Sequence, residues 1–326
     1  MWSPRWRYWR PNPRLHRNPN PTPSRTPRIL PTLHRPDLPP HKMGATTQTG
    51  LPPCFAIAKN SNRTLKMLRT RVISSLVAIP IVFVAVFVGG IWFALGAMAF
   101  GLIAGWEFTQ MMKTGGYHPA PLVTLVLVVL LVIDSYYTSV RLTALVISVA
   151  VLGSLVWQLF QHSSRPTADW ALAIAGGFYI GWGMAHLVAL RELADGLYWI
   201  GLALLCTWAA DSFAYFTGRA IGKNKLWPRH SPKKTWEGLF GGIAGSIVVA
   251  ILLALISPLN LLTAIIVGAV IPVAGLFGDL SISLMKRDVG VKDSSNLFPG
   301  HGGFLDRVDS LLFVSVVVYY FAVWIG

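Results

Sequence analysis

The stretch GDLSISLMKRDVGVKDSSNLFPGHGGFLDRVDS, residues 278–310, lies between two apolar runs of membrane-spanning length. Charge at this density beside membrane helices is costly unless it meets metal, phosphate or water. We therefore expect a metal-dependent site for phosphate chemistry at a membrane surface. The alternative is a basic loop whose lysines and arginines are merely neutralised by acids. The charged and titratable residues are Asp279, Lys286, Arg287, Asp288, Lys292, Asp293, His301, Asp306, Arg307 and Asp309.

The spacing within this stretch predicts two helix faces and a turn. Residues at i, i+4, i+7 and i+8 share one helix face, and so do residues at i and i+3. Between them, residues 299–303 read PGHGG, a turn whose backbone N–H groups can approach an anion closely. Carboxylates suit Mg²⁺, whereas lysine, arginine and glycine N–H groups suit phosphate. The first face carries Asp279, Ser283, Lys286 and Arg287, and the second carries Asp306 and Asp309.

Composition indicates a polytopic membrane protein. The chain has 326 residues, of which 53% are hydrophobic and 13% charged. The formal charge of +15 does not indicate nucleic-acid binding, because residues 1–71 hold 14 Lys and Arg and one acid, while the remainder holds 14 and 12. The two cysteines, Cys54 and Cys206, offer neither a disulfide framework nor a metal-binding spacing.

The first 66 residues are rich in proline and arginine and lack sustained apolar periodicity, which predicts a disordered leader. No apolar core of a secretory signal is present in it. Three interpretations stay open: a start assigned too far upstream, with Met67 or Met43 as the true start; a basic tail that touches anionic lipid; or a targeting segment. We place no catalysis in this leader.

Apolar runs begin at Val72 and predict an all-α protein with about nine transmembrane helices. With a cytoplasmic N-terminus, the opposite side receives only Arg141 and Arg191 among the loop cations, so the C-terminus is expected outside. Both charged loops, 218–236 and 279–307, then face the cytoplasm. The expected spans are about 72–88, 91–112, 120–138, 141–160, 169–190, 197–217, 237–257, 260–278 and 308–325.

A second charged stretch, residues 207–242, contains an aspartate in or near an apolar helix. Asp211, Tyr215 and Arg219 are spaced to line one helix face. Pro232 ends any preceding helix, and Ser231 or Thr235 can cap the next one, whose N–H groups would face a phosphate. Lys233 and Lys234 are candidate phosphate ligands, although simple anchoring at the membrane interface would also explain them.

Together these stretches resemble the phosphatidate cytidylyltransferases, or CDP-diacylglycerol synthases. The family signature runs Ser-x-x-Lys-Arg, four residues, Lys-Asp, then Pro-x-His-Gly-Gly-x-x-Asp-Arg-x-Asp, and residues 283–309 match it without departure. The upstream element with Asp-x-x-Ala-Tyr-x-x-Gly-Arg and Ser-Pro-Lys-Lys-Thr-x-Glu-Gly is present from Asp211 to Gly238. The resemblance covers roughly residues 67–326, which we expect to form the membrane cytidylyltransferase domain.

The resemblance implies that CTP and phosphatidate give CDP-diacylglycerol and pyrophosphate. The lipid phosphate is itself the nucleophile, so the chain needs to position substrates and neutralise charge. We expect Mg²⁺, as one or two divalent ions with a monovalent ion as a further option, held by Asp279, Asp306 and Asp309, with Asp211 next. Lys286, Arg287 and Lys292 complete the catalytic set, and the expected substrate-binding residues are Ser283, Arg307, His301, Gly302, Gly303, Arg219, Lys233, Lys234 and Asp211.

Further expectations follow from the resemblance or from the residues. The resemblance implies a homodimer. The expected location is a bacterial inner membrane with a cytoplasmic site, or an organelle membrane if the leader is a transit peptide. Glu107, in an apolar run, is expected to make a polar contact between helices or to line the lipid path. The rival functions are a cytidylyltransferase for another lipid phosphate and a transporter of an anionic substrate, which would place its charges near mid-span.

Overall fold

The computed structural model describes residues 80–137, 142–229, 231–295 and 302–325, all within Cys54–Gly326. The leader 1–66, residues 72–79 of the first expected span, and His301 lie outside the described residues. Residues 80–88 are helical. The helices that follow are α2 (Gly90–Thr114), α3 (Pro121–Tyr136), α4 (Thr143–Leu159), α5 (Pro166–Arg191), α6 (Gly196–Ile221), α7 (Trp236–Leu255), α8 (Leu261–Asp288) and α9 (Leu305–Ile325).

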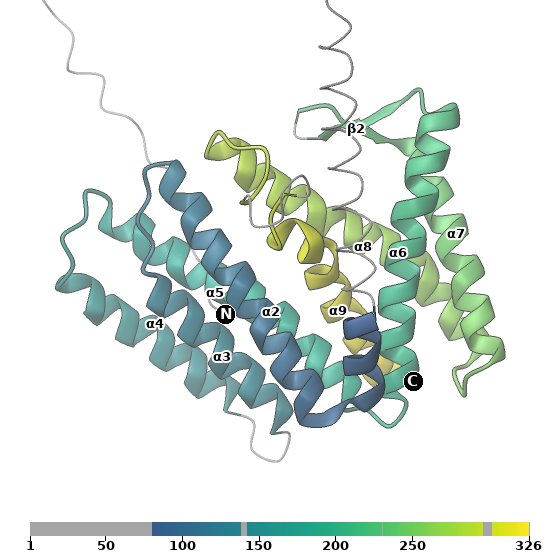
Figure 1. Cartoon of the computed structure of the whole chain (residues 1–326), viewed down its shortest axis with the longest axis horizontal. Helices are drawn as coiled ribbons and strands as arrows, with labels where there is room; N and C mark the ends of the chain where they lie inside the picture. The colour runs from purple at the N-terminus through teal and green to yellow at the C-terminus, as the bar shows by residue number, and fades with distance from the viewer. Residues whose placement is uncertain (1–79, 138–141, 230, 296–301, 326) are drawn as a thin grey trace, which may run out of the picture. The chain divides into compact units, whose positions relative to one another are not determined.

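Each expected span from the second to the ninth corresponds to one of these helices (Figure 1). Within the described ranges, six helices are long and apolar enough to cross a membrane: α2, α5, α6, α7, α8 and α9. The apolar helices α3 and α4 are shorter, with 16 and 17 residues. The prediction of an all-α polytopic membrane protein is therefore confirmed in its class, while the count of nine spans stays a prediction.

Two local features differ from the sequence expectation. Helix α8 does not end at Gly278 but continues to Asp288, so the charged face that starts at Asp279 belongs to the same helix as the apolar span. The chain between α6 and α7 forms a small antiparallel hairpin from β1 (Lys225–Trp227) and β2 (Ser231–Thr235). A proline at the second position of β2 is compatible with this two-stranded edge structure, since only one side of each strand must pair.

Glycines let the helices approach each other closely, as expected for a membrane bundle. A Cβ atom on Gly177 of α5 would lie 2.9 Å from the carbonyl oxygen of Thr124 in α3. One on Gly183 would lie 2.9 Å from the Cα atom of Leu312 in α9. These contacts make the glycine-rich run 176–183 a packing surface between helices.

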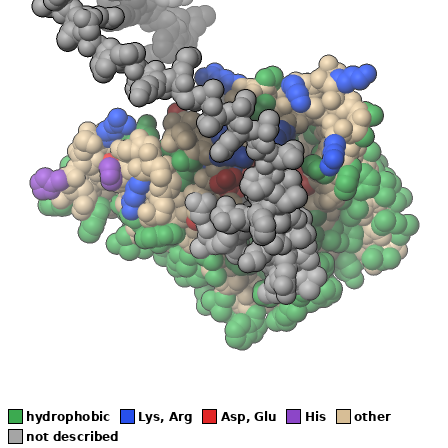
Figure 2. Space-filling model, turned by 45° about the horizontal axis from the view of Figure 1, so that its top comes forward, with side chains coloured by type: hydrophobic (Ala, Val, Ile, Leu, Met, Phe, Trp, Pro, Cys, Tyr) green, Lys and Arg blue, Asp and Glu red, His purple; other side chains and the backbone are tan. Residues whose placement is uncertain are grey.

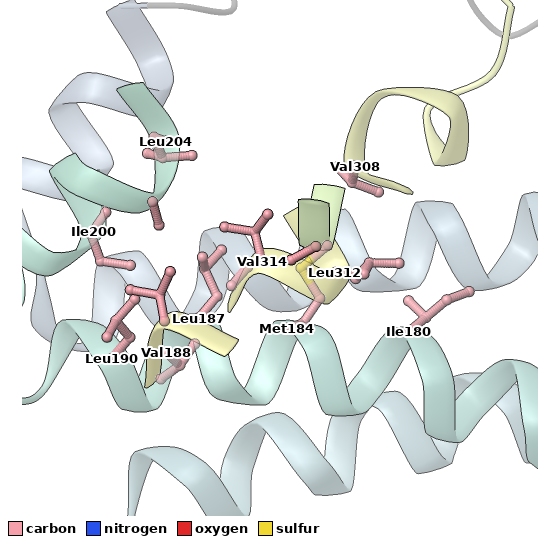
Figure 3. Close-up of a cluster of buried hydrophobic side chains, with 14 of the residues drawn as sticks. Ile180, Met184, Leu187, Val188, Leu190, Ile200, Leu204, Val308, Leu312 and Val314 are labelled. Atoms are coloured by element: carbon pink, nitrogen blue, oxygen red, sulfur yellow. The ribbon is translucent and has the colours of Figure 1, made fainter. Parts of the chain in front are cut away.

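The core lies where α5, α6 and α9 meet. Ile180 and Val188 of α5, Ile200 of α6 and Val314 of α9 are fully buried (Figure 3). Helix α9 also packs against α8, and α6 packs against both α7 and α8. This packing fixes the charged ends of α6, α8 and α9 relative to one another, which is what the candidate site requires.

Candidate active site

The two charged stretches meet at one end of the helices. The hairpin β1–β2, the C-terminal turns of α8 and the first turn of α9 all lie at this end (Figure 1). Lysine and arginine side chains gather there around acidic ones, above a surface of hydrophobic side chains (Figure 2). The sequence predicted this meeting of residues 207–242 with residues 278–310.

A cavity of about 400 Å³ opens between α6, α7, α8 and the hairpin. Asp211, Tyr215 and Arg219 line it from α6, so the predicted shared face of these three residues is confirmed. Ile271 and Asp279 line it from α8, and eight residues at 1.5 Å each separate them by about 12 Å along the helix. The cavity therefore runs along the helix axes, with charge at the hairpin end and apolar residues farther in.

An ion pair crosses the charged end of this cavity. Lys234 of β2 and Asp279 of α8 approach to 2.6 Å between Nζ and Oδ2, and their side chains stay 26% and 33% exposed. The other oxygen of Asp279 accepts a hydrogen bond of 3.0 Å from the hydroxyl of Ser283, one turn along the same helix. Ser283, expected to bind substrate, thus orients Asp279. We call Lys234–Asp279 the open pair.

Thr235 sets the position of this lysine. Its side chain caps α7 by accepting a hydrogen bond of 3.1 Å from the backbone N–H of Gly238, so one of the two caps predicted from the sequence is confirmed. The main chain of Trp236 also donates to the carbonyl oxygen of Asn224. The C-terminal end of the strand that carries Lys234 is therefore anchored.

A second ion pair lies two turns farther along α8. Lys286 donates to Oδ1 of Asp306 at 2.6 Å, with side chains 10% and 13% exposed. The other oxygen of Asp306 accepts from the backbone N–H groups of Ser294 at 2.9 Å and Gly303 at 3.1 Å. Gly302, at a φ of 80°, carries the chain into this turn in a conformation that favours glycine. We call Lys286–Asp306 the buried pair.

Further carboxylates face the open pair. Asp279 interacts electrostatically with Asp211 of α6 and with Asp309 of α9. Asp309 is 7% exposed and interacts in addition with Lys286 and Asp306 of the buried pair. Gly278 makes the approach of α8 to α9 possible, because a Cβ atom there would lie 3.0 Å from the Cα atom of Ser310. Acids from three separate helices thus converge at one end of the molecule.

The donor chemistry of these carboxylates suits Mg²⁺, which is often bound through one or two carboxylates together with substrate phosphates and water. The described residues do not contain a group of three His, Cys, Asp or Glu side chains arranged around a common metal position. Asp279 and Asp306 each hold a lysine instead. A complete shell of Asp279, Asp306 and Asp309 is therefore not formed, whereas a divalent ion on one or two of these carboxylates and a substrate phosphate fits them.

The remaining predicted phosphate ligands are spread more widely. Lys233 lines the cavity beside Lys234, and Arg219 donates to the Tyr215 hydroxyl at 3.2 Å. Arg287 is exposed and donates to the carbonyl oxygen of Val291 at 3.1 Å. The other cations of the signature, Lys292 and Arg307, are exposed at the surface, and no cavity described above includes them.

One residue of this region was not assigned to the site from the sequence. Glu107 of α2 is buried, with an exposed fraction of 3%. Its carboxylate accepts hydrogen bonds from Ser295 and Phe304, which precede and follow His301 in the sequence. Its position in an apolar run, beside Trp106, was the available signal, but that signal does not say which distant residues it contacts.

Comparison with known proteins agrees with the motifs. The family model described as the cytidylyltransferase family matches residues 69–325. The chain is 36% identical over 286 residues to a phosphatidate cytidylyltransferase of Synechocystis sp., covering 78% of this chain and 96% of that protein. It is 32% identical over 260 residues to the phosphatidate cytidylyltransferase of Bacillus subtilis, covering 78% and 97%. A third relative of the same name, from Staphylococcus haemolyticus, is 33% identical over 253 residues, covering 76% and 96%.

Proposed function

Since the chain belongs to the cytidylyltransferase family, we propose that it transfers CMP from CTP to phosphatidate, giving CDP-diacylglycerol and pyrophosphate. The observation that carries this proposal is the cavity between α6, α7 and α8. It combines the phosphate-binding cations Arg219, Lys233 and Lys234 with the carboxylates Asp211 and Asp279, and continues into an apolar part. A lipid phosphate is a molecule with this combination of a charged head and an apolar body.

The transfer is a direct in-line displacement. An oxygen of the lipid phosphate forms a bond to the α-phosphorus of CTP while the bond from that phosphorus to the pyrophosphate oxygen breaks. The nucleophile comes from the lipid, so the chain supplies position and charge rather than a covalent intermediate.

The residues of the cavity divide this work. Lys233, Lys234 and Arg219 hold the phosphates of the two substrates, and Lys234 leaves Asp279 when a substrate phosphate takes the place of that carboxylate. Asp279, kept in orientation by Ser283, would hold Mg²⁺ together with a substrate phosphate and one of its neighbours, Asp211 or Asp309. When bound, Mg²⁺ neutralises the charge that develops on the phosphates.

The apolar helices support a site for this reaction at a membrane surface. We propose the topology expected from the basic loops: nine spans, a cytoplasmic N-terminus and an external C-terminus, with the site on the cytoplasmic face. A bacterial inner membrane and a homodimer belong to the same proposal.

The test is a transfer assay with the purified full chain in detergent and lipid. CTP labelled at its α-phosphorus, but not at its γ-phosphorus, should label chloroform-extractable lipid when phosphatidate and Mg²⁺ are present. A chelator should abolish the labelling, and added Mg²⁺ should restore it. If label appears only with a polyprenol phosphate or an isoprenoid lipid phosphate, that lipid is the substrate in place of phosphatidate. Absence of labelled lipid with every lipid phosphate would overturn the proposal.

A further inference from the structure

Glu107 is a buried carboxylate that the reaction proposed above does not use. Glu107 lies on α2 between the exposed Trp106 and the fully buried Phe108, and it is itself only 3% exposed. A carboxylate inside a membrane-spanning helix is costly unless its oxygens are paired. Its partners therefore show what it is there to hold.

Four donors surround the two oxygens of Glu107. Oε1 accepts from the hydroxyl of Ser295 at 2.5 Å and from the backbone N–H of Phe304 at 2.9 Å. Oε2 lies 2.8 Å from the backbone nitrogen of Leu305 and 3.2 Å from the hydroxyl of Ser294. These donors come from both sides of residues 296–301, so one carboxylate ties the chain that leaves α8 to the chain that enters α9.

Two of these donors are N–H groups at the start of α9, which begins at Leu305. The first N–H groups of a helix lack partners within the helix, and a negative charge near them is favourable. A side chain of the same segment usually supplies the cap. Here the cap comes from α2, nearly two hundred residues earlier in the chain.

Gly303 fits against the same carboxylate. A Cβ atom at this position would lie 2.6 Å from Oε2 of Glu107, which is too close for any side chain. It would also meet the hydroxyl of Ser294. The predicted approach of this glycine to a phosphate stays a prediction, and the contacts show that it also lies close to Glu107.

The chain held by Glu107 is also the chain that holds Asp306. Ser294 and Gly303 donate their backbone N–H groups to Oδ2 of Asp306, whose other oxygen pairs with Lys286. The hydroxyl of Ser294 lies between the two carboxylates, 3.1 Å from Asp306 and 3.2 Å from Glu107. The orientation of Asp306 therefore depends on Ser294 and Gly303, and both of these residues also contact Glu107.

We propose that Glu107 is a positioning residue for the signature, which holds residues 294–295 and 303–305 so that Asp306 and Lys286 keep their geometry. This inference rests on the proposed cytidylyl transfer. Both oxygens of Glu107 are already hydrogen bonded, and Glu107 does not line the cavity between α6, α7 and α8. It acts on the reaction through Asp306 and does not touch substrate.

The test compares wild type with Glu107→Gln, both as full chains. The amide group presents an N–H₂ to donors that need an acceptor, so the loop loses part of its anchoring. We expect kcat to fall at least tenfold with KM for CTP changed less than threefold. Hydrogen exchange of the amides of Phe304 and Leu305 should become faster. The exchange readout does not depend on the reaction, so it separates failure of this inference from failure of the proposed function.

Asp169 provides the matched control. It is a buried carboxylate of α5 that accepts from the backbone N–H of His118 at 2.6 Å and from the hydroxyl of Ser163, away from the signature. Asp169→Asn should lower stability without the tenfold loss of kcat. Equal losses of kcat in both variants would reduce Glu107 to a general stabilising residue and overturn the inference.

A double-mutant cycle adds a second test. Ser295→Ala removes a hydroxyl that donates to the same carboxylate, so its cost in kcat should be smaller in the Glu107→Gln background than in the wild-type background. If the losses of kcat in the two single variants multiply in the double variant, the two residues do not act through one shared contact. Unchanged amide exchange in Glu107→Gln, or faster exchange with unchanged kcat, would also overturn the inference.

Discussion

The open pair and the buried pair join the same residue types at the same distance, yet their surroundings differ. Both bring a lysine Nζ to within 2.6 Å of an aspartate oxygen. The open pair stands in the wall of a cavity, about a quarter to a third exposed, and the second oxygen of Asp279 meets only a hydroxyl in the described structure. The buried pair is about one-tenth exposed, and backbone N–H groups hold the second oxygen of Asp306.

This difference indicates a division of labour. An exposed ion pair is weak, commonly 0–1 kcal/mol, so a substrate phosphate can replace its carboxylate at little cost. A buried pair that loses one partner leaves an uncompensated charge, at a cost of about 3–5 kcal/mol. The open pair is therefore suited to exchange with substrate, and the buried pair to hold α8 and α9 together.

The largest effect should follow from Asp306→Asn. Lys286 then loses the carboxylate with which it forms its ion pair, and the turn at Gly303 loses a charged acceptor. We expect turnover to be abolished and the free energy of unfolding to fall by about 3 kcal/mol, while the protein still inserts. Detergent unfolding and the transfer assay check both effects. Near wild-type turnover of this variant at saturating Mg²⁺ would show that Asp306 is not part of the active site.

Asp279→Asn should abolish turnover with little loss of stability. Its carboxylate is partly exposed, so Lys234 can turn to solvent, but the site loses a charge aimed at the substrates. Loss of one such preorganised group lowers kcat by roughly a hundredfold or more. The matched control is Asp288→Asn, an exposed acid of the same helix outside this cavity, which should keep wild-type rates. Equal rates in the two variants would exclude Asp279 from the chemistry.

Lys234→Met should act mainly on substrate binding. A hydrogen bond to a charged group is worth about 1.5–3 kcal/mol, and each 1.4 kcal/mol is tenfold, so KM for CTP or phosphatidate should rise roughly tenfold. Lys225→Met changes an exposed lysine of the same hairpin that does not line the cavity, and KM should then stay unchanged. Steady-state kinetics of both variants separate a specific contact from a general loss of positive charge.

The smallest effect is expected from deletion of residues 1–66. The leader carries none of the residues of either pair, so activity in membranes should equal that of the full chain at equal expression. Loss of activity in a well-expressed truncation would show that the leader takes part in function.

The sequence predicted those features that depend on local patterns. Apolar runs located the helices, the spacing of Asp211, Tyr215 and Arg219 placed them on one cavity wall, and Thr235 was one of two predicted caps. The extension of α8 to Asp288 was implicit in the helical spacing of its charged face, although the predicted span stopped at Gly278.

The features that the sequence did not predict depend on residues that are far apart in the chain. Lysines 234 and 286 were both predicted to hold phosphates, and their pairing with Asp279 and Asp306 follows from how α8 meets the hairpin and α9. The partners of Glu107 lie almost two hundred residues away from it. Spacing along one helix carries no information about such contacts.

The most direct test compares Lys234→Met and Lys286→Met in one detergent preparation. Both substitutions replace a lysine by an apolar side chain of similar length and remove one positive charge. We predict that Lys286→Met lowers the unfolding midpoint strongly, while Lys234→Met keeps the midpoint near wild type and raises KM. Equal midpoints for the two variants, or a larger loss of stability in Lys234→Met, would contradict the division of labour between the two pairs.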